Sequence, residues 1–276
     1  MELSNRRVLL TGATGGIGSA VAEALTLKGA TLLLTGRNEQ ALKALSEKLL
    51  GNHEIIVADI NSAAGREKII QQCSLGEGSH TQGSQTQGID VFINLAGTME
   101  FQFFERQTES GIEQLLHTNL ISPMLLCNKL IPLLKRKPEA AIVNVGSIFG
   151  SIGHPGFTTY CASKFGLRGF SEALRRELAD THIKVFYLAP RATDTGLNSN
   201  AVTSLNDALG NKTDSPSWVA SELVSLLTSN KHQRYLGWPE KLFVRVNSLF
   251  PGIVHNALVK KIPIIKRFSE QSTSSH

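Results

Sequence analysis

Apolar residues along the chain alternate between short continuous runs and longer stretches with helical spacing. The short runs predict strands at residues 7–11, 31–35, 54–58, 90–95, 140–145 and 184–188. Apolar positions that recur every three or four residues predict helices at 17–28, 39–50, 63–73, 112–135, 158–179 and 217–228. We expect a low-complexity loop at 76–88, an irregular segment at 190–215 and a short last strand at 234–237. This alternation predicts βαβ units and a parallel sheet.

The strands are apolar throughout, which is typical of a sheet buried on both faces. Right-handed crossovers then limit the topology to a doubly wound sheet. A chain of 276 residues fits a single domain of this kind and can bury a core without disulfides. The sequence therefore predicts an α/β fold, with a Rossmann-type doubly wound parallel sheet of about seven strands and helices on both faces. The domain is expected to cover residues 1–238, and residues 239–276 to form a basic amphipathic extension.

Charge is distributed unevenly along the chain. The net charge is +5, and residues 239–276 contain six Lys or Arg and two Glu, so this extension accounts for +4 and the body for only +1. A nucleic-acid-binding face is not expected in a nearly neutral body. Cys73, Cys127 and Cys161 have neither disulfide-framework nor metal-ligand spacing, and no metal site is expected. Without a recognisable secretory signal or long apolar span, we expect a cytoplasmic protein.

Residues 11–18, TGATGGIG, follow the first strand directly and open the first helix. Glycines at such a junction permit a tight turn and let the backbone approach a pyrophosphate closely. The free N–H groups of the helix start then bind the anion. Glycines also collect in turns for structural reasons, but the position between strand and helix favours a dinucleotide site.

Two further residues indicate which dinucleotide binds. No acidic residue ends the second strand, and Arg37 there offers a guanidinium to a 2′-phosphate. This favours NADP(H) over NAD, although a solvated loop arginine is the alternative. Asp59, after the third strand, is placed to accept a hydrogen bond from the adenine amine, or else to cap the following helix.

Three residues, one at the end of the fifth strand and two in the helix that follows, form a candidate catalytic group. Tyr160 and Lys164 are separated by four positions and so share one helix face. A lysine ammonium lowers the pKa of a nearby phenol, which suits a general acid and base. Ser147 ends the fifth strand and offers a hydroxyl to hold the substrate oxygen. Taken alone, a Tyr-x-x-x-Lys pair is more often a surface helix pair.

Together these motifs resemble the short-chain dehydrogenase/reductase family, in its compact single-domain branch. Residues 11–18 are similar to the family's TGxxxGxG, and Asn94-Leu95-Ala96-Gly97 is similar to its NNAG. Ser147, Tyr160 and Lys164 match its catalytic set, and Asn119 falls where the family keeps a catalytic asparagine. The resemblance extends from about residue 7 to residue 237.

The resemblance implies roles for individual residues. Tyr160 would protonate the carbonyl oxygen, Ser147 would orient it, and Asn119 would hold a water in a proton relay. Lys164 would bind the nicotinamide ribose. The chemistry of the individual residues and the family resemblance together predict the cofactor contacts. They are Gly12, Thr14, Gly15, Gly16, Ile17, Gly18, Arg37, Asp59, Ile60, Asn94, Ala96, Gly97, Tyr160, Lys164, Pro190, Thr193 and Thr195.

The chain departs from the family pattern at two positions. Leu95 replaces the second Asn of NNAG, and Arg191 replaces the Gly of a Pro-Gly pair, where a guanidinium would reach substrate or phosphate. Residues 191–213 are expected to form a lid over the substrate. Apolar side chains around the catalytic ends would line an apolar pocket: Met99, Phe101, Phe103, Phe104, Ile148, Phe149, Ile152 and Phe157.

Residues 239–276 are broken by prolines into two or three short amphipathic pieces. They are expected either to pack on the protein or to lie on an anionic membrane surface, which would place the protein at the inner face of a membrane. The expected function is NADP(H)-dependent hydride transfer between the nicotinamide and a small-molecule carbonyl/alcohol pair, with an apolar or lipid-like ketone or aldehyde as the carbonyl. The alternatives are an oxidising alcohol or hydroxysteroid-type dehydrogenase and a non-catalytic NADP-binding regulator. The resemblance also implies a homo-oligomer, through the helices that contain Asn119 and Tyr160.

Overall fold

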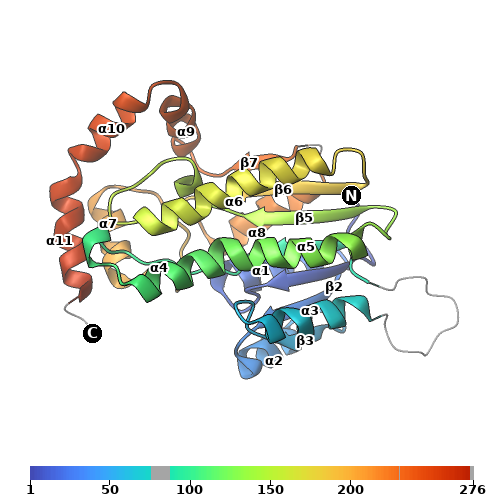
Figure 1. Cartoon of the computed structure of the whole chain (residues 1–276). Coiled ribbons are helices and arrows are strands. Elements are labelled where there is room, and N and C mark those ends of the chain that lie inside the picture. Colours follow the sequence, from blue (N-terminus) through green and yellow to red (C-terminus); the bar gives the residue numbers. More distant parts are fainter. Residues whose placement is uncertain (76–87, 230, 274–276) are drawn as a thin grey trace, which may run out of the picture.

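A computed structural model describes residues 1–75, 88–229 and 231–273, so most of the expected low-complexity loop at 76–88 lies outside the described residues. The sheet has seven strands, all parallel, in the order β3-β2-β1-β4-β5-β6-β7 (Figure 1). This confirms the predicted doubly wound sheet. The strands are β1 (Arg7–Thr11), β2 (Thr31–Gly36), β3 (Glu54–Val57), β4 (Val91–Asn94), β5 (Ala140–Val145), β6 (Ile183–Ala189) and β7 (Gln233–Tyr235).

Helices cover both faces of the sheet. Successive residues of a strand face opposite sides, so Leu10 packs in one core cluster and Leu9 in the other. The first cluster includes residues of α1 (Gly16–Thr26), α2 (Glu39–Lys48) and α8 (Pro216–Leu227). The second includes residues of α3 (Ala63–Ser74), α5 (Ser122–Leu134) and α6 (Thr158–Glu177). All three cysteines are free and buried, as expected for small apolar side chains.

The long helix predicted at 112–135 has an interruption. It consists of α4 (Glu109–Leu116), a π-helical turn η2 (His117–Ile121) and α5. Short 3₁₀ turns precede α4 and follow β5, at η1 (Phe104–Arg106) and η3 (Ile148–Gly150). Asn119 lies in the π turn and is 1% exposed. π turns are rare and occur often at functional sites.

The prediction of an irregular segment at 190–215 is wrong for its central part. Helix α7 (Asn200–Ala208) forms there, with Ser199 as its N-cap: the Ser199 hydroxyl accepts from the Val202 amide at 3.4 Å. Val202 and Leu205 are buried and pack with Tyr160 and Cys161 of helix α6 in a third apolar cluster. Tertiary burial of these two side chains stabilises a helix that the mostly polar sequence of the segment does not predict.

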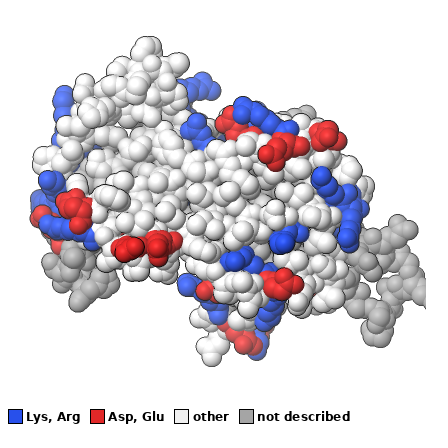
Figure 2. Space-filling view, in the orientation of Figure 1, with Lys and Arg blue, Asp and Glu red and all other residues white. Residues whose placement is uncertain are grey.

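The C-terminal extension forms three helices, α9 (Glu240–Leu249), α10 (Pro251–Val259) and α11 (Ile262–Thr273). It leaves the sheet after β7, projects outward and returns to pack α11 beside α7 (Figure 1). Ile265 of α11 is fully buried with Phe101 and Phe157. The expected packing of the extension on the protein is therefore observed for α11, whereas α9 and α10 form a projection whose visible face is mostly uncharged (Figure 2).

No single helix within the described ranges is long and apolar enough to cross a bilayer. Helices α9 and α10 have the required length and composition only when taken together, and they are bent by 118° relative to each other.

Candidate active site

A cleft of about 1300 Å³ opens at the carboxyl ends of the parallel strands. The chain reverses its winding between β1 and β4, and ligands of open α/β sheets bind at such a switch point. The β1–α1 turn, the ends of β4, β5 and β6, the segment 190–212 and part of the extension all contribute side chains to this cleft.

Two glycines of the β1–α1 turn occupy positions where any side chain would clash with neighbouring atoms. Gly12 has a φ of +69°, and a Cβ there would lie 2.8 Å from the Ala96 backbone. A Cβ on Gly16 would lie 2.6 Å from the Thr195 side chain. Gly15 is the N-cap of α1 and offers no side chain to its free N–H groups. The start of α1 therefore has the features of a pyrophosphate site.

Most of the expected cofactor residues line the cleft, but two do not. Gly18 lies beneath the turn, where a Cβ would overlap the Gly12 carbonyl oxygen. Asn94 is 2% exposed and its side-chain amide donates to Asn144 Oδ1 at 3.3 Å. Both residues hold the turn and the strand ends in place behind the cleft. The following residues line it: Gly12, Thr14, Gly15, Gly16, Ile17, Arg37, Asp59, Ile60, Ala96, Gly97, Tyr160, Lys164, Pro190, Thr193 and Thr195.

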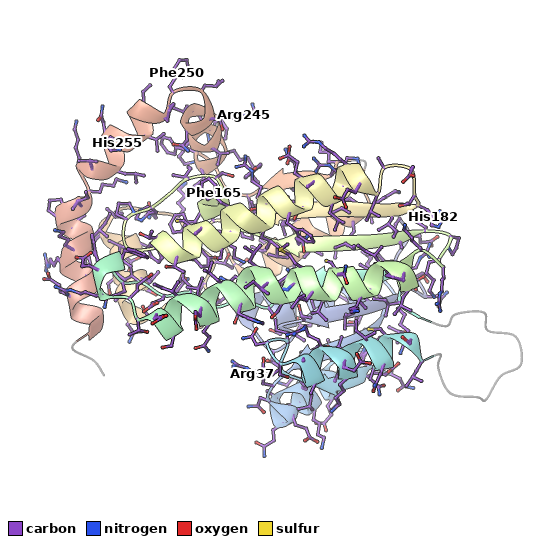
Figure 3. All side chains as sticks on the ribbon, viewed as in Figure 1. Arg37, Phe165, His182, Arg245, Phe250 and His255 are labelled. Atoms are coloured by element: carbon purple, nitrogen blue, oxygen red, sulfur yellow. The ribbon has the colours of Figure 1, made fainter. Side chains whose placement is uncertain are left out.

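At the far end of the cleft, Arg37 is exposed just after β2 (Figure 3). None of the ion pairs among the described residues includes Arg37, so its guanidinium is available to an anion. Asp59 also lines the cleft and accepts from the Asn61 amide at 2.9 Å. Ser62, rather than Asp59, caps α3, because its hydroxyl accepts from the Gly65 amide at 2.9 Å.

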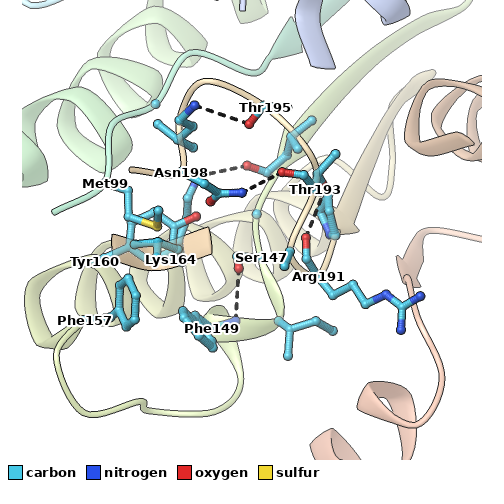
Figure 4. A pocket seen from close by; sticks show the side chains of 18 of the residues that line it. Met99, Ser147, Phe149, Phe157, Tyr160, Lys164, Arg191, Thr193, Thr195 and Asn198 are labelled. Atoms are coloured by element: carbon cyan, nitrogen blue, oxygen red, sulfur yellow. Dashed lines mark hydrogen bonds between the residues drawn. The ribbon is translucent and has the colours of Figure 1, made fainter. Parts of the chain in front are cut away.

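Tyr160, Ser147 and Lys164 meet in the middle of the cleft (Figure 4). Tyr160 and Lys164 are only 7% and 6% exposed, and the Ser147 hydroxyl lies near enough to the Tyr160 phenol to act on its pKa. The Ser147 hydroxyl also accepts from the Phe149 amide at 3.1 Å, and this contact fixes its position at the start of η3. The Lys164 ammonium donates to the Val145 carbonyl at 3.1 Å and lies 5.7 Å from the centre of the Tyr160 ring.

The expectation that Lys164 depresses the pKa of Tyr160 does not hold, because the pKa of Tyr160 lies above its ordinary value. Burial raises the pKa of Tyr160 to about 12, and the Ser147 hydroxyl opposes this only in part. Burial likewise lowers the pKa of Lys164 to about 8. Desolvation disfavours the charged form of each group and is the largest cause of both shifts.

Asn119 lies behind the cleft rather than in its lining. Its Oδ1 accepts from the Thr98 amide and its Nδ2 donates to the Thr98 carbonyl, both at 2.8 Å. Nδ2 also donates to the Ser163 hydroxyl at 3.1 Å. Asn119 therefore joins the loop after β4 to helix α6. It fixes Gly97, which lies on the cleft wall facing Lys164.

Arg191 does not face the reacting centre, contrary to the expectation that it would reach substrate or phosphate. Figure 4 shows its side chain directed away from Tyr160. Its guanidinium forms a bidentate pair with Asp214, at 2.6 and 3.0 Å, and contacts Glu240 at 3.1 Å. Asp214 follows the lid segment and Glu240 begins α9. Arg191 thus ties the end of β6 to the lid and to the extension.

The remaining part of the cleft is largely apolar. Five of the eight predicted apolar residues line it, whereas Phe101 is core, Phe103 packs beside it and Phe104 is 55% exposed outside. Sequence reasoning missed His154, which stacks on Phe149 at 4.9 Å. The expected lid forms part of an apolar wall of the cleft, but the share of this wall that the extension contributes was not predicted. This wall includes Val202, Leu205, Leu209, Phe243, Ile253, Val254, Ala257, Leu258 and Lys261.

Across the described ranges, no group of three His, Cys, Asp or Glu residues is placed to hold a metal ion.

The doubly wound sheet and the glycine turn at its switch point define a Rossmann-type dinucleotide-binding protein. Residues 6–206 match the family model described as short chain dehydrogenase. The chain belongs to the short-chain dehydrogenase/reductase family of oxidoreductases.

Relatives with assigned names are consistent with this membership. The chain is 30% identical over 234 residues to nodulation protein G of a Rhizobium species, covering 83% of this chain and 92% of that protein. It is 32% identical over 188 residues to the 3-oxoacyl-[acyl-carrier-protein] reductase FabG of Haemophilus influenzae, covering 68% and 74%.

Solved structures show the same fold. A short-chain dehydrogenase from Streptomyces avermitilis superposes with a TM-score of 0.76 at 25% identity, covering 95% of this chain and 98% of the other. A short chain dehydrogenase from Burkholderia cenocepacia in complex with NADP superposes with a TM-score of 0.77 at 20% identity, covering 94% and 99%.

Proposed function

We propose that this protein is an NADP(H)-dependent oxidoreductase that reduces an apolar ketone or aldehyde, such as one carried on an acyl chain. The observation that carries the proposal is the Tyr160–Ser147 pair, placed between the glycine turn and an apolar wall in one cleft. The name of the 3-oxoacyl reductase relative supports a carbonyl on a long apolar chain. Residues 1–238 would form the cofactor-binding and catalytic domain, with 239–276 as an extension that completes the cleft.

The bound nicotinamide would supply the hydride, and the residues of the chain handle the proton. A phenol whose pKa is about 12 keeps its proton at neutral pH, so Tyr160 is ready to act as an acid. The Tyr160 O–H bond breaks as the carbonyl oxygen takes the proton, and the product is an alcohol. Ser147 holds the same oxygen through its hydroxyl. Lys164, which is charged at neutral pH, favours the phenolate left behind.

Arg37 would set the preference for NADP(H). Replacing Arg37 with Ala is expected to weaken NADPH binding about 10- to 100-fold, because a charge-assisted hydrogen bond to the 2′-phosphate contributes about 1.5–3 kcal/mol. NADH binding should be unchanged. Fluorescence titration of the purified protein with both nucleotides measures this difference.

The matched control is Lys48→Ala, which removes a cation from the end of α2 outside the cleft and should leave both affinities unchanged. Equal affinity of the wild type for NADH and NADPH would contradict the assigned role of Arg37. It would favour the oxidising dehydrogenase instead.

A homo-oligomer is also proposed, through α5 and α6. Four large apolar side chains on or beside these helices are each 41–42% exposed: Ile121, Met124, Leu125 and Phe165. Exposed apolar patches of this kind often mark protein interfaces. Sedimentation of the wild type should therefore give a mass above that of one chain, and a monomer would contradict the proposal. We also propose that the protein is cytoplasmic and lies at the inner face of a membrane.

A further inference from the structure

Helices α9 and α10 and the residues next to them expose several large apolar side chains. We call this surface the apolar ridge, and it includes Trp238, two residues before α9, and Phe250, between the two helices. The exposed fractions range from 45% for Leu242 and Val259 to 71% for Leu249. Phe250, at the bend between the two helices, is 60% exposed and points outward (Figure 3). The ridge consists of Trp238, Leu242, Phe243, Leu249, Phe250, Ile253 and Val259.

Cations border the apolar ridge. Two of these cations, Lys241 and Arg245, lie on α9, and two more, Lys260 and Lys261, follow the end of α10. None of the four takes part in an ion pair within the part of the chain that the structure describes. The acidic residue there is Glu240, which is held by Arg191 at 3.1 Å. In Figure 2 the projection is white with blue at its edges and shows no red. An apolar face with a cationic border complements an anionic lipid surface.

The apolar ridge is continuous with the cleft. Trp238, Phe243 and Ile253 are exposed on the ridge and also line the cleft. The inner side of α10 presents Val254 and Leu258 to the same cleft. An apolar molecule leaving a lipid layer at the ridge would therefore reach Tyr160 along an apolar wall.

We propose that the apolar ridge docks on anionic phospholipid bilayers and admits the apolar substrate directly from the lipid. The inference rests on the proposed function for its substrate class, but not for the docking itself. A second copy of the chain is a poorer occupant, because a two-fold contact would bring the cationic border against itself. The bend at Phe250 is the most outward part of a convex projection, which suits insertion below lipid headgroups.

Flotation of the full chain with vesicles tests the docking without cofactor or turnover. The wild type should float with vesicles containing phosphatidylglycerol and far less with phosphatidylcholine alone, and high salt should weaken binding. The double variant Leu249→Ser, Phe250→Ser should lose about tenfold or more in binding, and Lys260→Gln, Lys261→Gln a similar amount on anionic vesicles. The control is Leu27→Ser, Leu50→Ser, which removes equally exposed apolar side chains far from the ridge.

Flotation that is absent in the wild type, or unchanged in both ridge variants, overturns the proposal. A loss of oligomeric mass in the Leu249→Ser, Phe250→Ser variant without wild-type flotation would assign the ridge to a contact between copies. Binding only to an acidic protein, with no flotation, would assign it to a protein partner. A wild type that floats but does not reduce any ketone with NADPH would contradict the proposed function alone.

Discussion

Replacing Tyr160 with Phe is expected to lower the rate of NADPH-dependent carbonyl reduction by about 100- to 10,000-fold, the range that general acid catalysis contributes. The variant keeps the buried ring and its packing but loses the hydroxyl that donates the proton. NADPH binding should change little, because the glycine turn and Arg37 remain. Steady-state kinetics with a panel of apolar ketones, together with fluorescence titration of NADPH, measures both properties.

Tyr235→Phe is the matched control. Tyr235 lies on β7, outside the cleft lining. The substitution removes a phenol hydroxyl that accepts from the Ser151 hydroxyl at 3.3 Å. Its rate should stay within about twofold of the wild type, since the substitution keeps the half-buried ring and removes a hydroxyl that does not line the cleft. If Tyr160→Phe retained full activity, the proposed mechanism would be wrong. A wild type that binds NADPH but turns over no carbonyl or alcohol would favour the non-catalytic regulator.

Replacing Arg191 with Met is expected to lower the free energy of unfolding by about 2–4 kcal/mol, because it leaves the carboxylates of Asp214 and Glu240 without their cation. The three side chains are 12%, 9% and 22% exposed, so water compensates only in part. Arg191 is a positioning residue, since it acts on the lid and the extension rather than on substrate. We therefore expect a raised KM for apolar substrates with a smaller change in kcat.

Two further variants distinguish positioning from a general loss of stability. Arg191→Lys keeps the charge but not the bidentate geometry and should restore part of the lost stability and part of KM. Arg234→Met breaks the ion pair between Arg234 of the edge strand β7 and Glu222 of α8, at 18% and 28% exposure, without touching the lid or α9. It should cost about 1 kcal/mol or less and leave KM unchanged. Equal effects of Arg191→Met and Arg234→Met on KM would refute the positioning role.

Sequence patterns located the core of the site because they depend on local chemistry. The junction of β1 and α1, and the spacing of Tyr160 and Lys164 on one helix, require only nearby residues. The same reasoning could not separate residues that line a cleft from those that support it. Asn94 and Gly18 belong to motifs next to the cleft, yet Asn94 pairs with Asn144 across the sheet and Gly18 lies under its own turn.

The pKa values illustrate a second limit. A lysine four residues from a tyrosine suggests a depressed phenol pKa, but the sequence does not give the depth of burial of either group. Burial raises the pKa of Tyr160 and lowers that of Lys164. The electrostatic effect of a bound dinucleotide would add to this balance and is not encoded in the spacing.

The sequence by itself determined the class of fold, the glycine turn after the first strand and the placement of Tyr160 and Lys164 on one helix face, because apolar period, glycine turns and helical spacing are local properties. Only the tertiary structure decided that Arg191 holds the lid and the extension, that α7 forms, and that α10 completes the wall of the cleft. Those contacts join residues such as Arg191 and Glu240, or Ile265 and Phe157, which are far apart in the chain. Their pairing depends on how the packed elements are arranged in space, and no single segment of sequence records that arrangement.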